Sequence, residues 1–229
     1  DLTEDVLKTE NKKVNLEEFE LEMKKQKELS KKSWKGETFN TDEKIWKDIS
    51  NELEKTNFLG YEKNKSEAKI LKIVSKGNII EEANQVNEPL SLVLDKTPFY
   101  AEAGGQVGDT GIIKGENFFF EVHDTQVIQS KIYEHSGILI EGKIKEGDVA
   151  NSEINLVKRK KIAANHSATH LLHSALRKKL GKHITQKGSL VSDEKLRFDI
   201  SHNEKIDQET LMMIEKDINQ KILECAPVS

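Results

Sequence analysis

The chain has 229 residues, of which 33% are charged and 35% hydrophobic, and its formal net charge is −4. This length predicts one or two domains, and the net negative charge argues against a protein whose whole surface binds nucleic acid. The only cysteine, Cys225, excludes an internal disulfide and favours a reducing, cytoplasmic setting, while no apolar run reaches the roughly 18 residues of a membrane span.

Residues 1–57 show helical patterns. Asn15 can cap a first helix, with Glu18 three residues later as in a capping box, and Thr41 can cap a second helix. Apolar residues recur at helical spacing in this second segment, at Ile45, Ile49 and Leu53. The polar faces of both predicted helices are rich in Lys and Glu, so we expect solvated helices that pack on a neighbour.

Residues 58–156 contain short segments that are β-branched or aromatic and partly alternating. Gly, Asn and Asp separate them, as in the sequences KGN, GEN and EGD. The segments are AKILKIVS, PLSLVLD, TGIIKG, NFFFEVHD, KIYEHSGILIEG and DVANSEINL. Several short strands at regular spacing predict a small β-barrel or sandwich.

Residues 157–229 return to helical patterns. One long helix is predicted over 158–180, a strand pair over 188–202 and a final helix over 207–223. The chain is thus expected to be an α+β protein with three parts, at 1–57, 58–156 and 157–229.

Four of the seven histidines lie between residues 163 and 190. His166 and His170 are four residues apart, so on a helix both imidazoles face one side and can reach one metal ion, as in zinc sites. The alternative is a pair of partly buried, hydrogen-bonded histidines. His173 could also pair with His170, so the spacing does not decide which two bind.

A basic segment surrounds these histidines. Between Leu156 and Lys187 there is no Asp or Glu, and there are nine cations: Lys158, Arg159, Lys160, Lys161, Arg177, Lys178, Lys179, Lys182 and Lys187. In a chain with net negative charge, such a segment fits a polyanion, although it could also be a solvated helix face.

The segment TPFYAEAGGQVGDTG, residues 97–111, carries glycines at Gly104, Gly105 and Gly108. Glycine permits positive φ angles and close approach of another molecule to the backbone. We therefore consider two interpretations, a tight loop that caps the barrel and a backbone surface that a ligand approaches.

Taken together, TPFYAEAGGQVGDTG, NHSATHLLHSALRKKLGKHITQKGSLV and LRFDISH resemble the central region of alanyl-tRNA synthetases. The opening segment is similar to the end of that family's helical tRNA-recognition region. The resemblance covers nearly the whole chain. It implies that residues 1–57 end the tRNA-recognition helices, that residues 58–156 form a small antiparallel β-barrel, and that residues 157–229 begin an editing core.

The resemblance also implies an activity and its partners. Family members attach alanine to tRNA(Ala) with ATP and Mg²⁺, in an aminoacylation domain that would precede Asp1. Their editing domain hydrolyses tRNA(Ala) mischarged with serine or glycine. DNA and membranes are not expected partners.

Zinc is the metal that the resemblance implies for the editing domain. Family members hold it through H-x-x-x-H and a later Cys-x-x-x-His. His166 and His170 match the first half, whereas Cys225 is followed four residues later by Ser229. We therefore expect this sequence to be a piece of a longer protein and its zinc site to be incomplete.

Site residues follow from the same match. Gln186 corresponds to the family's editing-site glutamine and could orient water or the ester, and Thr169 could bond a seryl hydroxyl. Arg197 and Asp199 are weaker candidates, since they could equally form a structural ion pair. We expect tRNA contacts from Lys158, Arg159, Lys160, Lys161, Gly104, Gly105 and Gln106.

Two other functions remain open. A free-standing trans-editing hydrolase would share the chemistry but not the helices of residues 1–57. A non-enzymatic RNA-binding barrel would bind tRNA without hydrolysing its ester, and His166 and His170 would then be satisfied core groups.

Overall fold

The computed structural model describes residues 18, 25 and 39–225. The chain divides into two compact units, Asp1–Glu43 and Lys44–Ser229, and the second contains the barrel and the elements that follow it. The first predicted helix, with its Asn15 cap, lies outside the described residues except for Glu18 and Lys25, which are both helical.

Helix α3 (Phe39–Glu52) confirms the second predicted helix. It begins two residues before Thr41, so the prediction that Thr41 is its N-cap is wrong. A shift of one or two residues is ordinary at helix ends, because the terminal turns fray. The predicted apolar stripe does pack. Ile49 is fully buried with Val93 and Ile132, and Ile45 and Leu53 contact the same cluster.

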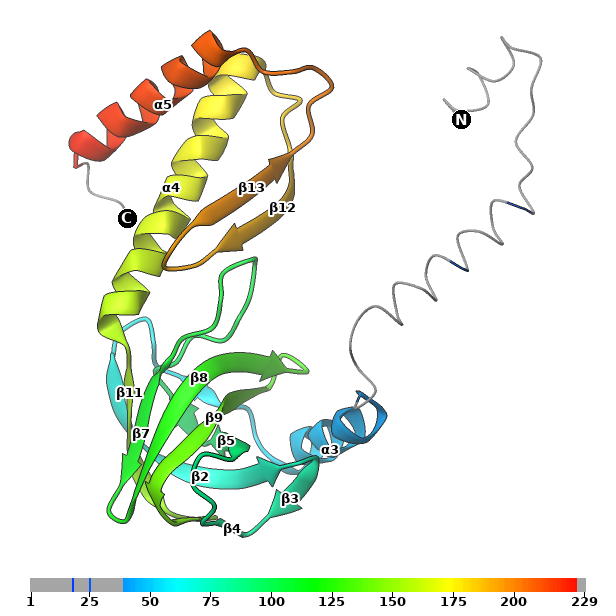
Figure 1. Cartoon of the computed structure of the whole chain (residues 1–229), viewed down its shortest axis with the longest axis vertical. Coiled ribbons are helices and arrows are strands. Elements are labelled where there is room, and N and C mark those ends of the chain that lie inside the picture. Colours follow the sequence, from blue (N-terminus) through cyan, green and yellow to red (C-terminus); the bar gives the residue numbers. More distant parts are fainter. Residues whose placement is uncertain (1–17, 19–24, 26–38, 226–229) are drawn as a thin grey trace. The chain divides into compact units, whose positions relative to one another are not determined.

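Six antiparallel strands form a closed barrel, in the order β11-β7-β8-β9-β5-β2, and β11 pairs with β2 to close it (Figure 1). Their bounds are β2 Lys65–Ser75, β5 Pro89–Leu94, β7 Gly111–Gly115, β8 Phe118–Ile128, β9 Ile132–Gly142 and β11 Val149–Ile154. The short strands are β1 Asn57–Phe58, β3 Asn78–Ile80, β4 Glu82–Ala83, β6 Lys96–Thr97 and β10 Ile144–Lys145. The barrel predicted within residues 58–156 is therefore confirmed.

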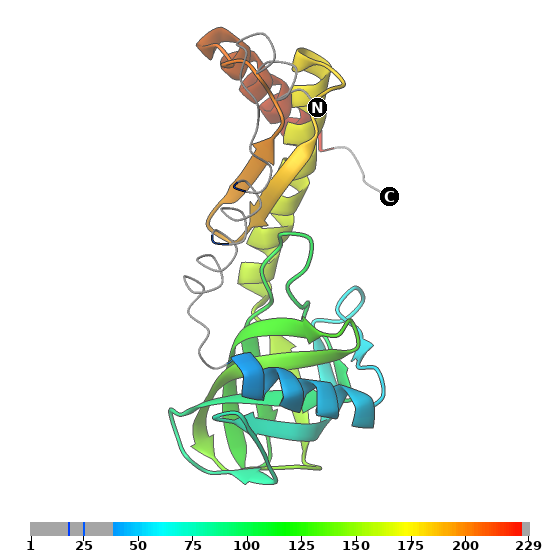
Figure 2. The same ribbon diagram turned by 90° about the vertical axis from the view of Figure 1, so that its right-hand side faces the viewer.

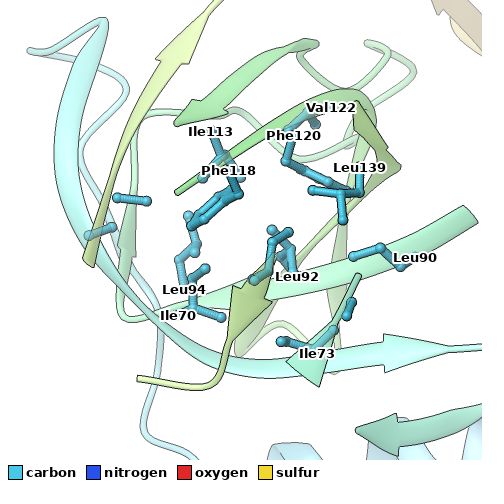
Figure 3. Packing of buried hydrophobic residues seen from close by; sticks show 14 of the residues in the cluster. Ile70, Ile73, Leu90, Leu92, Leu94, Ile113, Phe118, Phe120, Val122 and Leu139 are labelled. Carbon is cyan, nitrogen blue, oxygen red and sulfur yellow. The ribbon is translucent and has the colours of Figure 1, made fainter. Parts of the chain in front are cut away.

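Inward-facing aliphatic and aromatic side chains fill the barrel (Figure 3). Leu92, Leu94, Ile113, Phe120 and Leu139 are all fully buried. Burial of one such side chain contributes about 1.5–3 kcal/mol, so this cluster supplies much of the barrel's stability. The alternating burial along β8 and β11 is the pattern that the sequence predicted.

One histidine lies within this core. His135 has no exposed surface; its Nδ1 donates to the Leu92 carbonyl (3.1 Å), and the Thr97 hydroxyl donates to its Nε2 (2.7 Å). Burial lowers the pKa of His135 to about 4, and the hydrogen bond to Leu92 offsets this only in part. The imidazole is therefore neutral at physiological pH.

After the barrel, helix α4 (Leu156–Leu180) begins at the Asn155 cap, whose side chain accepts from the Lys158 amide, and ends at Gly181. A hairpin of β12 (Gln186–Val191) and β13 (Leu196–Ile200) and helix α5 (Gln208–Leu223) follow (Figure 2). Leu176, Ile184 and Ile214 form the centre of a small core among these elements. The α+β class is confirmed, and no described helix is long and apolar enough to cross a membrane. The predicted division of the chain into three parts, with boundaries after residues 57 and 156, stays a prediction.

Candidate functional site

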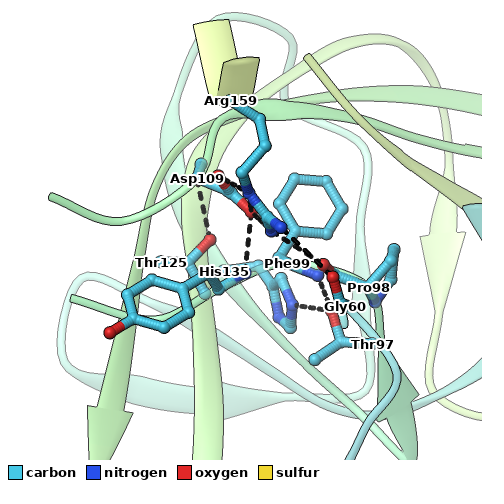
Figure 4. A network of polar contacts seen from close by, with 9 residues as sticks. Gly60, Thr97, Pro98, Phe99, Asp109, Thr125, His135 and Arg159 are labelled. Carbon is cyan, nitrogen blue, oxygen red and sulfur yellow. Dashed lines mark hydrogen bonds and ion pairs between the residues drawn. The ribbon is translucent and has the colours of Figure 1, made fainter. Parts of the chain in front are cut away.

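An ion pair joins the start of helix α4 to the barrel (Figure 4). Arg159 Nε donates to both carboxylate oxygens of Asp109, at 2.8 and 2.9 Å, and Nη2 also bonds Oδ2. Nη1 of Arg159 donates to the Gly60 carbonyl and Nη2 donates to the Pro98 carbonyl, each at 3.2 Å. Only 2% of the Asp109 side chain is exposed. Arg159 thus uses its donors inside the protein, unlike its exposed neighbours Lys160 and Lys161.

Two turns further along α4, the predicted histidine pair lies on one helix face. The rings of His166 and His170 are 5.0 Å apart between centroids. His166 Nδ1 lies 2.7 Å from Oε1 of Gln106, which comes from the glycine-containing loop of the barrel. Because an amide oxygen only accepts, Nδ1 of His166 carries a proton and donates this hydrogen bond.

The glycine-containing loop is a tight turn. Ala103 and Gln106 exchange two backbone hydrogen bonds, of 3.2 and 3.0 Å, around Gly104 (φ +60°) and Gly105 (φ +85°). Positive φ at both central positions is the geometry of a type I′ turn, for which glycine is suited. The sequence therefore needs glycine here for the turn itself.

This turn docks on the edge of β12. The Val191 amide donates to the Gly105 carbonyl (2.7 Å), and the Val107 amide donates to the Val191 carbonyl (3.1 Å). A Cβ on Gly105 would lie 2.4 Å from the Ser189 carbonyl oxygen, whereas a Cβ on Gly104 would meet nothing within 4 Å. Three residues of this loop were predicted to contact tRNA. Gly105 and the buried Gln106 instead contact other parts of the protein, whereas the space around Gly104 is free.

The two predicted catalytic residues come from different elements, Thr169 from helix α4 and Gln186 from strand β12. Thr169 is buried, and its hydroxyl donates to the Asn165 carbonyl at 2.9 Å, within its own helix. Gln186 is exposed at the start of β12, opposite Ile200 and next to a bulge before Gly188. No hydrogen bond in the described part of the chain joins Gln186 to either histidine.

The other histidines of this region take different places. His173 packs on Phe198, with 5.2 Å between ring centroids, and its Nε2 is buried without a hydrogen-bond partner among the described residues. His183 Nε2 lies 3.1 Å from His202 Nδ1 near the base of the hairpin. Cys225 is exposed. Arg197 and Asp199 form an exposed ion pair at 3.2 Å, which is the structural alternative considered for them.

The donor set for zinc can be tested on this geometry. His166 Nε2 is available, and His170 is exposed on the same face. Among residues 44–225, however, no group of three His, Cys, Asp or Glu side chains could hold a metal ion. Catalytic zinc sites use three protein ligands and structural sites four. These residues alone therefore do not fit zinc, and no chemical step is assigned to it.

Two features of the site were missed in the sequence. Asp109 was not recognised as the partner of Arg159, since the two residues are 50 positions apart and no local pattern links them. The contact between Gln106 and His166 joins residues 60 positions apart. Only the closed barrel brings their two segments together, and no local pattern signals it.

A profile of the family described as "tRNA synthetases class II (A)" matches residues 1–157. The chain belongs to this class II tRNA synthetase family. It is 41% identical, over all 229 residues, to an alanine–tRNA ligase of Mesorhizobium japonicum. The resemblance to alanyl-tRNA synthetases is thereby confirmed, and the chain spans 26% of the length of that relative.

Proposed function

We propose that the chain acts as part of an alanine–tRNA ligase that attaches alanine to tRNA(Ala) with ATP and Mg²⁺. Membership of the class II synthetase family and the identity to an alanine–tRNA ligase along the whole chain support this proposal. ATP and Mg²⁺ would act in an aminoacylation domain elsewhere in the ligase.

The region of α4, β12 and β13 would hydrolyse tRNA(Ala) mischarged with serine or glycine. A pocket discriminates poorly against a smaller amino acid or one that adds only a hydroxyl group, so a ligase for alanine needs a second, hydrolytic site. The observation that carries this assignment is the orientation of His166 by Gln106, on a helix that an ion pair fixes to the barrel. Such support from surrounding residues is typical of reactive sites.

Particular residues can be given roles in this hydrolysis. The exposed amide of Gln186 would orient the ester or the attacking water. The Thr169 hydroxyl donates to the Asn165 carbonyl and keeps its acceptor lone pairs, so it would accept a hydrogen bond from the seryl hydroxyl. His166 Nε2 and the exposed His170 ring offer two nitrogens on the helix face that the aminoacyl group would approach.

The tRNA backbone would lie along the exposed cations at the start of α4. Lys160 and Lys161 are exposed and Lys158 is half-buried, while no acidic residue occurs from 156 to 187. We leave Arg159 out of this surface because its guanidinium is bonded to Asp109, Gly60 and Pro98. The tRNA surface is therefore Lys158, Lys160 and Lys161, with Gly104 at the tip of the neighbouring loop.

The experiment compares Gln186→Ala with Gln85→Ala in a ligase that contains these 229 residues and an aminoacylation domain. Gln186→Ala is expected to slow deacylation of seryl-tRNA(Ala) by about 100-fold, as loss of one orienting group does elsewhere. Alanine charging should stay unchanged, and so should both activities of Gln85→Ala, a variant of an exposed barrel residue. Equal loss of both activities in Gln186→Ala would contradict the proposal.

A further inference from the structure

Four aromatic rings meet on the surface of the barrel. Phe58 lies at the centre, with ring centroids 5.0 Å from Tyr61, 6.2 Å from Tyr100 and 5.7 Å from Tyr133. The Tyr133 ring is stacked on Phe58, and the other two meet it edge-on. None of the four belongs to the buried core of the barrel. We call this group the aromatic cluster.

Tyr61 is the outermost member of the aromatic cluster. It is 87% exposed, and no other aromatic side chain from Lys44 to Cys225 is classed with the exposed large hydrophobic residues. Phe58, Tyr100 and Tyr133 are half-buried. A ring exposed to this extent contributes little to folding, and a set of exposed edges and faces is the arrangement on which nucleobases stack.

The segments that carry the cluster are held firmly. The Leu59 amide donates to the Thr97 carbonyl (2.8 Å), and the Tyr133 amide donates to the Thr56 hydroxyl (3.2 Å). The Tyr100 amide donates to Asp109 (2.8 Å), the same carboxylate that pairs with Arg159. The backbone beside these rings is therefore fixed before any ligand arrives, which reduces the entropy lost on binding.

The start of helix α4, which carries the proposed tRNA surface, is bonded to the segment that carries Phe58 and Tyr61. Arg159 bonds the carbonyl of Gly60, which stands between Phe58 and Tyr61 in the chain. Arg159 follows Lys158 on helix α4 and precedes Lys160 and Lys161. Aromatic rings next to a basic surface are the usual combination in proteins that bind single-stranded nucleic acid.

Helix geometry indicates which part of tRNA would reach the cluster. Arg159 precedes His166 by seven residues, which corresponds to about 10 Å along a helix. The aminoacyl ester is at the 3′ end of tRNA, so an ester at His166 would bring the preceding unpaired nucleotides to the barrel. We propose that the aromatic cluster stacks on unpaired nucleotides at the 3′ end of tRNA, an inference that rests on the proposed editing function.

The test measures binding of intact tRNA(Ala), and of tRNA(Ala) without its unpaired 3′ nucleotides, to the 229-residue chain at several salt concentrations. Tyr61→Ala should bind the intact tRNA about 5- to 100-fold more weakly, the range seen when one base loses its stacking partner. Its salt dependence should be unchanged, because no cation is removed. Wild type and Tyr61→Ala should bind the shortened tRNA equally.

Three variants make the result specific. Tyr61→Phe keeps the ring and should bind like wild type. Val149→Ala removes another exposed barrel side chain and should also bind like wild type. A triple variant, Lys158→Ala, Lys160→Ala and Lys161→Ala, should lose affinity for both tRNAs with a weaker salt dependence.

If Tyr61→Ala binds intact tRNA like wild type, or loses affinity for both tRNAs equally, the stacking proposal is overturned. If the triple variant still loses affinity in that experiment, the proposed tRNA surface stands without the aromatic cluster. If wild type binds neither tRNA, the proposed function fails as well.

Discussion

Gln106 accepts a hydrogen bond from Nδ1 of His166 at 2.7 Å and so joins a barrel loop to helix α4. Both groups are partly or fully removed from solvent, with Gln106 only 8% exposed. The contact therefore fixes which nitrogen of His166 carries the proton and holds the ring toward His170. The orientation of this histidine thus depends on the barrel as well as on its own helix.

The first prediction concerns this contact. Gln106→Ala should lower the free energy of unfolding by about 1–3 kcal/mol, because it leaves His166 Nδ1 without its partner. It should also raise the share of the other imidazole tautomer, which ¹⁵N chemical shifts of His166 report. The matched control is Gln126→Ala, which removes two hydrogen bonds on the barrel surface. A His166 spectrum unchanged by Gln106→Ala would show that the loop does not orient the ring.

The second prediction concerns the ion pair of Asp109 and Arg159. Removing one partner of a buried pair leaves the other charge without compensation, so Asp109→Ala should cost about 3–5 kcal/mol in urea unfolding. Glu153→Ala is the matched control, since Glu153 pairs with Lys65 at 2.8 Å on the surface. An exposed pair of this kind contributes at most about 1 kcal/mol. Equal effects of the two substitutions would contradict the structural role of Asp109.

The third prediction concerns pH. His135 has a pKa of about 4 in the folded protein, against 6.5 ordinarily. Between these values the unfolded chain binds a proton that the folded protein does not, so stability falls as pH falls from 6.5 to 4. Because one pKa unit corresponds to about 1.4 kcal/mol, His135 should account for a loss of about 3 kcal/mol.

Comparison of unfolding curves at pH 7.5 and pH 4.5 for wild type and His135→Gln measures this contribution. The glutamine variant should be less stable at pH 7.5 but should lose less stability on acidification. His123→Gln, which changes an exposed histidine of the same barrel, is the control and should lose as much stability as wild type between pH 7.5 and pH 4.5. If His135→Gln loses as much stability as wild type between the two pH values, other groups carry the pH dependence.

The fourth prediction concerns the tRNA surface. Each phosphate contact contributes about one unit to the slope of log K against log salt. Replacement of Lys158, Lys160 and Lys161 by alanine should therefore make that slope shallower by about two to three. A triple replacement of Lys114, Lys143 and Lys145 on the barrel is the control of equal charge and should change the slope little. An unchanged slope in the α4 variant would remove this surface from the tRNA contact.

The fifth prediction concerns zinc in residues 1–229. Two imidazoles on one helix face bind zinc weakly compared with sites of three or four ligands. The purified chain should therefore hold much less than one zinc per molecule after dialysis against a chelator, as elemental analysis would show. Stoichiometric, chelator-resistant zinc would identify a further ligand, and substitution of His173, His183 and Cys225 in turn would locate it.

Local patterns in the sequence predicted most of the elements. Alternation and β-branched residues marked all six barrel strands, although β2 begins earlier than expected, at Lys65, and β8 extends further, to Ile128. The apolar stripe of α3 was also correct, because burial on one face repeats with the helical period. The five short strands, β1, β3, β4, β6 and β10, were not predicted, since two or three residues leave no period to detect.

The site was harder to predict because its contacts are not local. Arg159 was grouped with its lysine neighbours by charge, and only the fold shows that Asp109, 50 residues earlier, binds it. The glycines of residues 104–105 left two interpretations open, a tight loop and an approaching ligand, and the tight turn with its docking on β12 accounts for them. The resemblance to a family supplied Gln186, which no physical pattern in the sequence would have distinguished from other glutamines.

The docking of residues 103–107 on Val191 has a consequence for protein engineering. Both backbone polar groups of Val191 bond to this loop, so the loop acts as a third strand of the hairpin. A chimaera that joined helix α4 and the hairpin to a foreign barrel would leave this strand edge unpaired and prone to association. The smallest transplantable module is therefore the hairpin together with the barrel that presents this loop.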